Sequence, residues 1–221
     1  MVIIMRINQL FNDGWQFSKF DLATNLANSN SSDVVWADVE IPHDWLIYNA
    51  NALYEDGEGW YRKNFTIESL DDKVISIYFE GVYMNSTIYI NGELAGEWKY
   101  GYSSFEFDIS KLLKIGNNEI KVQVVHKSPN SRWYSGAGIY RSVWLRTTAP
   151  SHLVSDGIYI STSKNSDNWI VHVDSEAIIK DKGFDTQEEG LGWNNNISIK
   201  QTITDKSGKI VAETSDILKD Q

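Results

Sequence analysis

Alternation of apolar and polar side chains, interrupted by short turn sequences, constrains the fold of this chain more than any other feature. Residues 105–109 read Phe-Glu-Phe-Asp-Ile, and residues 119–125 alternate in the same way, as expected for strands with one buried face. The longer period of an amphipathic helix is absent, apart from a single short turn predicted at residues 109–113. The pattern therefore predicts an all-β chain.

Turn sequences separate the predicted strands at intervals of about ten residues. Asn91-Gly92 is the strongest of them, because both central positions of a type I′ hairpin turn require a positive φ. Residues 116–118 and 205–208 supply further turns. Strands are expected at residues 74–79, 86–90, 105–109, 119–125, 143–146, 157–162, 169–174, 197–204 and 209–213. Many short strands of this kind are typical of a β-sandwich or a jelly roll.

A domain boundary is expected at Pro150, one of only three prolines in the chain. We expect one β domain over residues 1–149 and a second over residues 150–221. The second domain supplies about four or five strands, whereas an immunoglobulin-like sandwich needs about seven. Residues 181–196 are acidic and contain Gly and Asn, so they are predicted to form a loop. The second sandwich is therefore expected to be incomplete at its C-terminal end.

Composition argues against several classes of function. The net charge is −10 and no Lys/Arg cluster exists, so a nucleic-acid partner is not expected. The absence of Cys excludes disulfides, thiol nucleophiles and thiolate metal sites. The apolar run at residues 2–5 is too short for a signal peptide. No stretch approaches the roughly 20 apolar residues of a membrane helix. A cytoplasmic location without membrane partner or cofactor is the expectation.

The segment from Ser131 to Arg141 is the most distinctive stretch of the chain. Its Gly136-Ala-Gly138 could suggest a dinucleotide-binding loop, but that motif needs a third Gly, a preceding strand and a following helix. A strand is predicted after it instead. A tight loop, in which glycine permits positive φ, is the simpler interpretation.

Two further segments contain candidate polar residues. In Ile41-Pro-His-Asp-Trp45, Asp44 could accept hydrogen bonds from sugar hydroxyls or orient a loop. His43 and Asp44 are unsuited as a catalytic pair if the segment is a strand, because adjacent side chains would point to opposite faces. Residues 57–65 read as a loop entering a strand, and Glu58 has no evident catalytic partner there. The four His residues do not have the spacing of metal ligands, so no metal site is predicted.

Taken together, these segments resemble the N-terminal region of glycoside hydrolase family 2, most closely its β-galactosidase members. The matching stretches occur in the family's order across roughly residues 8–146. They are residues 12–17 (Asn-Asp-Gly-Trp-Gln-Phe), 41–45, 59–63 (Gly-Trp-Tyr-Arg-Lys), 79–85, 89–92, 101–105 (Gly-Tyr-Ser-Ser-Phe), and 131–141 followed by Val143-Trp-Leu145. Any one stretch is weak, whereas their ordered combination is specific.

The resemblance implies a jelly-roll sugar-binding domain, then the start of an immunoglobulin-like β-sandwich, ahead of a TIM barrel. In the family both catalytic Glu residues lie on the barrel, so no residue of this chain is predicted to be catalytic. The loop carrying Arg132 and Trp133 is expected to reach the barrel mouth and contact substrate, and Asp44 is a further candidate contact. Some members carry an acidic residue near the position of Arg132, so the sugar specificity stays open between β-galactoside, β-glucuronide and β-mannoside.

The resemblance predicts a β-galactoside substrate and the parent's TIM barrel as partners, and exposed sandwich faces could also support a homo-oligomer. Two other functions remain open from the sequence. Aromatic residues make up 13% of the chain, including nine Trp, which would suit a stand-alone lectin-like module. A purely structural or interaction domain is the other alternative.

Overall fold

The computed structural model describes residues 6–24, 26–27, 34–48, 51–130, 133, 136–179 and 198–217. Within these residues nearly all regular structure is β-strand, with one short 3-10 turn, η1 (Ser110–Leu112). The described part of the chain contains no helix long and apolar enough to cross a membrane. The chain divides into two compact units, residues 1–180 and 181–221. The prediction of an all-β fold is confirmed.

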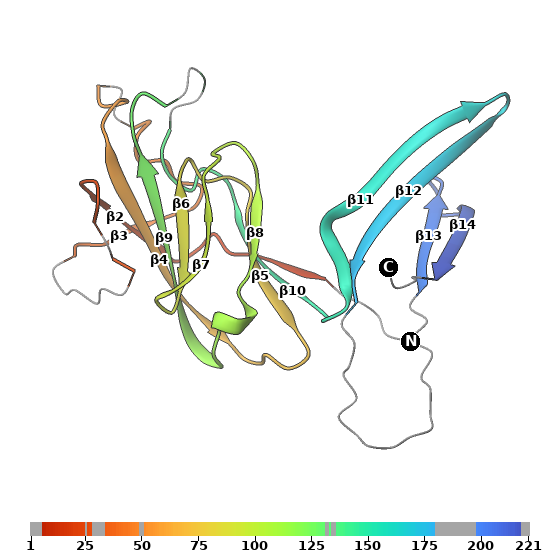
Figure 1. Cartoon of the computed structure of the whole chain (residues 1–221), viewed down its shortest axis with the longest axis horizontal. Helices are drawn as coiled ribbons and strands as arrows, with labels where there is room; N and C mark the ends of the chain where they lie inside the picture. The colour runs from red at the N-terminus through yellow and green to blue at the C-terminus, as the bar shows by residue number, and fades with distance from the viewer. Residues whose placement is uncertain are drawn as a thin grey trace. The chain divides into compact units, whose positions relative to one another are not determined.

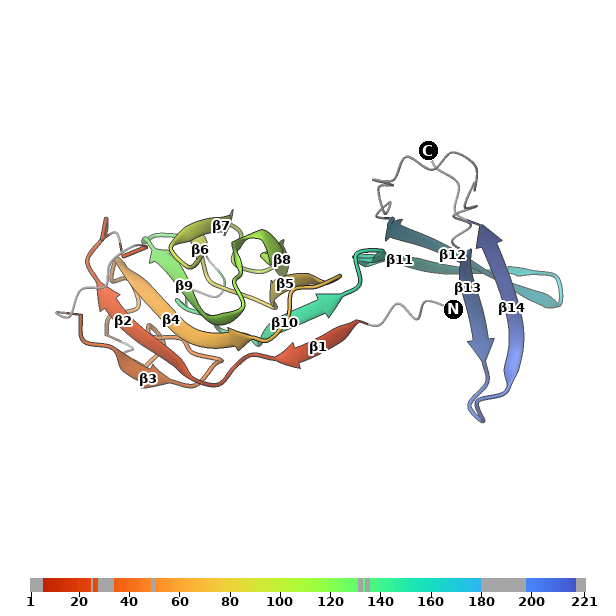
Figure 2. The same ribbon diagram turned by 90° about the horizontal axis from the view of Figure 1, so that it is seen from below.

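Two antiparallel sheets face each other in the first unit (Figures 1 and 2). The four-stranded sheet has the order β1 (Ile7–Leu10), β10 (Val143–Thr148), β5 (Val74–Phe79), β8 (Phe105–Asp108). The six-stranded sheet has the order β3 (Ala37–Val39), β2 (Trp15–Phe20), β4 (Gly57–Ile67), β9 (Gly116–His126), β6 (Ser86–Ile90), β7 (Glu93–Trp98). The order is not sequential in either sheet, as in the jelly-roll sandwich that the sequence predicted.

The core between the sheets follows directly from the alternation in the sequence. On β9, Ile120, Val122 and Val124 are fully buried, and the facing sheet contributes Ile77 and Phe79. Burying an aliphatic or Phe side chain of this size stabilises the fold by about 1.5–3 kcal/mol relative to exposure. Asn91-Gly92 forms the predicted turn between β6 and β7, with φ of 53° and 86°.

The sequence predicts that residues 57–65 are a loop entering a strand, but residues 57–59 are already the first residues of β4. All three pair with β9, and Glu58 and Gly59 also pair with β2. The two glycines hide the alternation that would otherwise mark the strand. Glu58 between them is buried, and its carboxylate accepts hydrogen bonds from the Gln123 side chain at 2.8 Å and the Ala23 backbone at 2.5 Å. Strand pairing and these donors offset the cost of burying the charge.

A small apolar cluster covers the outer face of β4. Trp60 is fully buried there beside Leu26 and Ala27, and its ring stacks on Tyr89 with centroids 6.0 Å apart. The Lys121 ammonium is buried under the same segment, where it donates to the Leu26 carbonyl at 3.2 Å. Leu26 and Ala27 therefore cover part of the outer face of the sheet, a role that sequence alternation alone does not indicate.

Two hairpins follow the sandwich in sequence. In the first unit, β11 (His152–Asn165) pairs with β12 (Asn168–Ile178). In the second unit, β13 (Ser198–Thr204) pairs with β14 (Ile210–Ile217), and the Asp205 carboxylate closes their turn by accepting from the Ser207 and Lys209 backbones. These strands fit the start of an immunoglobulin-like sandwich. The predicted loop at 181–196 lies outside the described residues, and the domain boundary at Pro150, between β10 and β11, stays a prediction.

Gly59 provides a test of packing on the inner face of β4. A Cβ at this position would lie 2.5 Å from Trp45 Cη2 and 2.8 Å from Phe17 Cε2, where the two rings stack with centroids 5.3 Å apart. We expect Gly59→Ala to lower the free energy of unfolding by about 1–3 kcal/mol, because the rings must move aside. Urea unfolding followed by far-UV circular dichroism measures this loss.

The matched control is the Trp45→Leu variant, alone and combined with Gly59→Ala. The smaller side chain leaves space for the new methyl group, so the double variant should lose less free energy of unfolding than the two single losses added. Strict additivity would show that the clash with Trp45 is not the cause.

Candidate functional site

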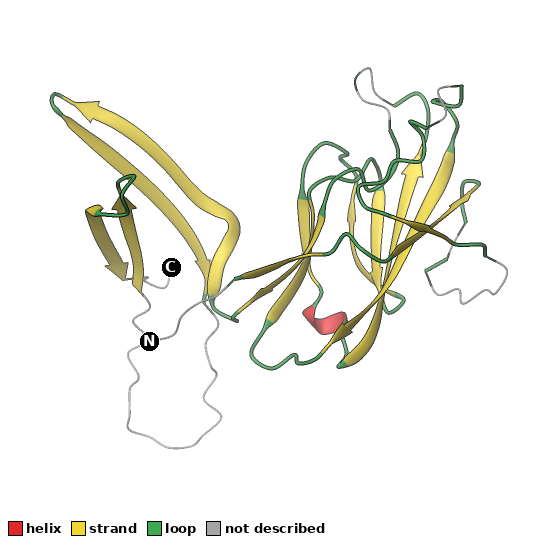
Figure 3. Cartoon of the chain, turned by 180° about the vertical axis from the view of Figure 1, so that it is seen from behind, coloured by secondary structure: helices red, strands yellow, loops and turns green. Residues whose placement is uncertain are grey.

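Several connections emerge from the same end of the sandwich, as strand register requires. His126 at the end of β9 pairs with Gly57 at the start of β4, and Ser86 at the start of β6 pairs with Trp98. In the four-stranded sheet, Phe79 at the end of β5 pairs with Phe105 at the start of β8 and with Val143 at the start of β10. The connections at residues 80–85, 99–104 and 127–142 consequently gather at this end, where Figure 3 shows the loops.

A cavity of about 350 Å³ is lined by residues from the connection between β3 and β4 and from the connections at 99–104 and 127–142. It is lined by Pro42, His43, Asp44, Ile47, Tyr48, Tyr102, Trp133, Tyr140 and Arg141. Asp44 and Trp133, two of the three residues predicted from the sequence to contact substrate, line the same cavity. Arg132 lies outside the described residues. Aromatic walls with a few polar groups are the usual composition of a small-molecule site, and they suit a sugar ring.

Asp44 organises the loop on one side of this cavity. Its side chain is buried, and Oδ1 accepts hydrogen bonds from the backbone N–H groups of Leu46 at 2.9 Å, Ile47 at 3.3 Å and Ala137 at 3.0 Å. The first two close a local turn, and the third ties that turn to the segment that follows Trp133. Loop orientation, one of the two roles considered for Asp44, is therefore what the geometry shows, while a sugar contact stays a prediction.

Backbone pairing reinforces this link between residues 43–45 and 137–139. The His43 N–H donates to the Ile139 carbonyl at 2.8 Å, and the Trp45 N–H donates to the Ala137 carbonyl at 3.0 Å. Gly138 lies between these bonds with φ of 139°, and a Cβ there would overlap the His43 carbonyl and lie 2.5 Å from the Tyr61 hydroxyl. Only glycine fits, so Gly138 shapes the loop, as the sequence predicted.

The other end of the Trp133 segment is fixed at Asn130. His126 is fully buried, and Nδ1 lies 2.8 Å from the Glu55 carbonyl, which can only accept, so Nδ1 carries the proton. Nε2 then accepts from the Asn130 amide at 3.0 Å, and the Asn130 oxygen accepts from the Tyr83 hydroxyl at 3.3 Å. Both ends of the segment are thus held by buried polar side chains.

Exposed aromatic rings lie at the cavity. Trp133 is 87% exposed and Tyr48 is 77% exposed, although large apolar side chains are usually covered in a folded domain. Tyr102 also lines the cavity, and its ring meets those of Tyr83 and Tyr100 edge-on. Rings of this kind present apolar faces on which the C–H side of a pyranose can pack.

Burial shifts the pKa of two ring side chains at the cavity. Desolvation lowers the pKa of His43, against the opposing charge of Asp44, which favours the neutral imidazole. Its Nδ1 lies 2.8 Å from the Tyr61 hydroxyl. Desolvation raises the pKa of Tyr140, whose hydroxyl donates to the Gly101 carbonyl at 2.8 Å. Neutral hydrogen-bonding groups therefore accompany the aromatic walls.

Sequence reasoning did not assign Tyr48, Tyr102, Tyr140 or Arg141 to the site. Tyr102 lies in the Gly-Tyr-Ser-Ser-Phe motif, and Tyr140 and Arg141 close the 131–141 motif, so each lay within or beside a recognised segment. What the sequence lacked was the register that brings these segments together. No group of three or more His, Cys, Asp or Glu residues in the described ranges is arranged to hold a metal ion.

The role of Asp44 in orienting the loop can be tested by two substitutions. Asp44→Ala leaves three buried or half-buried N–H donors without this acceptor, so we expect the free energy of unfolding to fall by about 3 kcal/mol. Asp44→Asn keeps an oxygen at Oδ1 and should lose only about 1 kcal/mol. Urea unfolding of the 221-residue chain, followed by circular dichroism, measures both. Equal losses in the two variants would contradict the loop-orienting role.

Comparison with known proteins identifies the family. The family described as "Glycosyl hydrolases family 2, sugar binding domain" matches residues 27–149. A beta-galactosidase of Bacteroides ovatus is 36% identical over 217 residues, which cover 92% of this chain and 24% of that protein. A putative beta-glucuronidase of Formosa agariphila is 36% identical over 205 residues, covering 87% of this chain and 20% of that protein.

Solved structures agree with the sequence comparison. A beta-glycosidase from Bacteroides vulgatus superimposes with a TM-score of 0.80 at 31% identity, over 96% of this chain and 28% of that one. A family 2 member from Bacteroides cellulosilyticus gives a TM-score of 0.77 at 32% identity, over 96% of this chain and 29% of that one. The chain thus spans about a quarter of the length of these relatives. It belongs to glycosyl hydrolase family 2, of which it carries the sugar-binding domain.

Proposed function

We propose that this region forms one wall of the substrate pocket in a retaining β-galactosidase-type glycoside hydrolase. The segment carrying Arg132 and Trp133 contacts the sugar at the mouth of a TIM barrel contributed by another part of the parent protein. The observation that carries the proposal is the exposed Trp133 ring beside a cavity of about 350 Å³, on a segment whose two ends are fixed by buried polar groups.

Fixed ends matter because a substrate contact contributes to rate only when it is held in place. Asp44 holds the segment after Trp133, and Asn130 holds the segment before it. Ordering a free loop at the moment of binding would cost roughly 1–2 kcal/mol for each backbone residue fixed. Anchors at Asn130 and Ala137 restrain the backbone on either side of Trp133, which lowers part of that cost and helps the ring to orient substrate for a reaction on the neighbouring domain.

The 221-residue chain by itself is proposed to be inactive and to bind sugars weakly. The cavity is formed from one domain only, whereas ligand sites usually bury most of the ligand surface. Saturable turnover of a chromogenic β-galactoside by the purified chain would contradict this. The proposal includes a cytoplasmic location and a homo-oligomeric parent.

The Trp133 contact can be tested in the parent enzyme. Trp133→Ala should raise KM for an aryl β-galactoside by about tenfold, equivalent to about 1.4 kcal/mol of lost binding, because a ring face no longer covers the sugar. Tyr54→Ala is the matched control: Tyr54 is 79% exposed but does not line the cavity, so its removal should leave KM unchanged. Equal effects of the two changes would count against the proposed contact.

A β-glucuronidase activity is the second candidate, and Arg141 is the observation that favours it. Arg141 lines the cavity, is exposed, and has its guanidinium carbon 5.3 Å from the Tyr140 ring centroid. A guanidinium at this place could pair with the carboxylate of a uronic acid. One of the relatives described above is named a putative beta-glucuronidase, and another a beta-galactosidase.

Arg141 substitutions in the parent enzyme distinguish the two substrates. If the glycone is a uronic acid, Arg141→Ala should lower kcat/KM for an aryl β-glucuronide by at least about tenfold, through loss of a charge-assisted hydrogen bond. Arg141→Lys should restore part of it, and the aryl β-galactoside rate should barely change. The second candidate would be eliminated if the unsubstituted parent hydrolysed the aryl β-galactoside but not the aryl β-glucuronide.

A further inference from the structure

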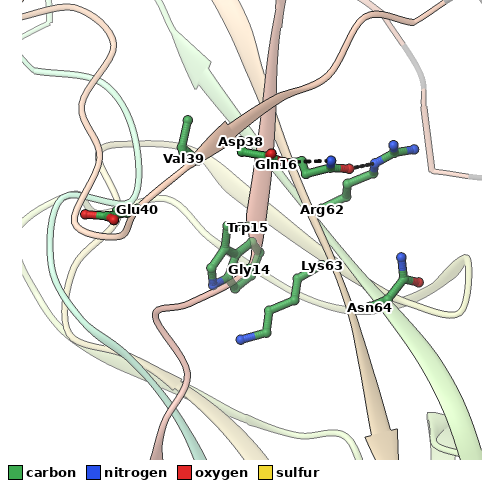
Figure 4. Close-up of a pocket in the computed structure, with 9 residues that line it drawn as sticks. All are labelled: Gly14, Trp15, Gln16, Asp38, Val39, Glu40, Arg62, Lys63 and Asn64. Atoms are coloured by element: carbon green, nitrogen blue, oxygen red, sulfur yellow. Dashed lines mark hydrogen bonds between the residues drawn. The ribbon is translucent and has the colours of Figure 1, made fainter.

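A second cavity of about 540 Å³ lies at the start of β2, and none of its lining residues belongs to the cavity beside Trp133. It is lined by Gly14, Trp15, Gln16, Asp38, Val39, Glu40, Arg62, Lys63 and Asn64 (Figure 4). Lys63 closes the Gly-Trp-Tyr-Arg-Lys motif, which was singled out in the sequence and which the proposed function does not use. The proposed function therefore assigns no role to this cavity.

The polar residues along one side of the cavity already satisfy one another. The Gln16 amide donates to Asp38 Oδ1 at 2.9 Å, and the Gln16 oxygen accepts from Arg62 Nε at 2.9 Å. Figure 4 shows this chain of bonds, with the Lys63 side chain extending away from it toward Trp15. Arg62 also lies over the Trp36 ring, with its guanidinium carbon 4.3 Å from the ring centroid. The polar groups on this side of the cavity are therefore bonded to one another in a network within the protein.

Lys63 is held differently. Its ammonium donates to the Phe11 carbonyl at 3.0 Å, lies 3.6 Å from the Phe11 ring centroid and 5.9 Å from that of Trp15. Trp15 is fully buried, so this side of the ammonium faces the apolar core. No carboxylate within ion-pair distance of Lys63 occurs in the part of the chain that the structure describes. The amine is half-buried, fixed in position and open to a cavity.

Three other lysines among the described residues lack this combination. Lys121 is buried, but it forms an ion pair with Glu119 at 3.2 Å and donates to the Leu26 carbonyl beneath a covering segment. Lys164 lies 6.0 Å from the Trp169 ring centroid, but it is exposed to solvent. Lys19 is paired with Glu55 at 2.6 Å. Lys121 and Lys164 therefore serve as internal controls for burial and for aromatic proximity.

We propose that Lys63 is a covalent modification site, at which the amine condenses reversibly with small aldehydes that enter the cavity. The amine nitrogen attacks the aldehyde carbon to form a carbinolamine, which loses water to give an imine. One C=N bond replaces the C=O bond, the carbonyl oxygen leaves as water, and no oxidant or reductant is consumed. The imine nitrogen stays next to the Phe11 carbonyl, which can accept a hydrogen bond from its protonated form.

Electrostatics supports the geometry. Burial lowers the pKa of Lys63 to about 8, partly offset by the charge of Asp13. At pH 7 roughly a tenth of such an amine is neutral, against less than about a thousandth of an ordinary lysine. A weaker base is also a weaker nucleophile, which removes part of the advantage, so a net gain of roughly tenfold in rate is expected. Asp38, Glu40 and Arg62 are the other charged groups that line the cavity.

Trace labelling of the 221-residue chain tests the proposal. The protein is treated at pH 7 with less than one equivalent of pyridoxal, and sodium cyanoborohydride traps the imine as a stable secondary amine. Peptide mass mapping then gives the label on each lysine. Lys63 should carry about tenfold more label than Lys164, and Lys121 should carry the least. Equal or lower labelling of Lys63 relative to Lys164 would overturn the proposal.

A pH series and one variant complete the experiment. Labelling of Lys63 should stop rising near pH 8, because most of its amine is then already neutral. A rise in Lys63 labelling that continues well above pH 8 would contradict a neutral amine at Lys63. Lys63→Arg keeps the charge and the donor to Phe11 but has no nucleophilic amine at these pH values, so it should lose this label alone. If that variant fails to fold, the label distribution and pH series of the wild-type chain decide the matter.

Discussion

The carboxylate of Asp44 connects two segments that lie 93 residues apart in sequence, and the geometry of the cavity beside Trp133 depends on it. One oxygen accepts from Leu46, Ile47 and Ala137, so the loop after β3 and the segment before β10 share a single buried acceptor. A hydrogen bond to a charged group contributes about 1.5–3 kcal/mol, and a buried donor left unpaired costs about 1–3 kcal/mol. The two segments are therefore held together more tightly than backbone pairing alone would hold them.

This junction can work only because the sandwich delivers the segments to one place. Antiparallel register sets His126 of β9 opposite Gly57 of β4 and Val143 of β10 opposite Phe79 of β5. Gly138 then passes between the His43 carbonyl and the Tyr61 hydroxyl, at a distance that no Cβ could tolerate. Core packing, register and one glycine together place Trp133 beside the cavity, while its ring remains exposed for a ligand.

Much of the fold could be predicted from the sequence because period-2 alternation reports directly on which side chains are buried. The expected strand at 86–90 agrees with β6, and the short turn at 109–113 contains η1. Prediction failed at residues 57–59, where glycines erase the alternation and a buried Glu58 resembles a surface residue. It also missed β1 and β3, which are short and largely exposed, so they lack an apolar face to detect.

For the site, the sequence indicated single residues but not their arrangement. Asp44 and Trp133 were selected from separate motifs, and the structure places both at one cavity. The hydrogen bonds of Asp44 and the links from His126 through Asn130 to Tyr83 depend on residues far apart in the chain, which local patterns do not encode. Tyr48 and Arg141 were missed for the same reason, since each belongs to the cavity only through its neighbours in space.

The buried ionic groups of the domain follow a common rule, and Lys63 departs from it in one respect. Asp44 is satisfied by backbone donors, Glu58 by Gln123, Trp60 and a backbone N–H, and Lys121 by carbonyls and Glu119. Glu58 and Lys121 are enclosed by the chain around them, and Asp44 lines the cavity beside Trp133 with its Oδ1 occupied by three backbone donors. Lys63 likewise donates to a backbone carbonyl, but it also faces an open cavity. A lysine that is desolvated enough to lose its proton and is still accessible can react as a nucleophile, whereas an enclosed charged group cannot.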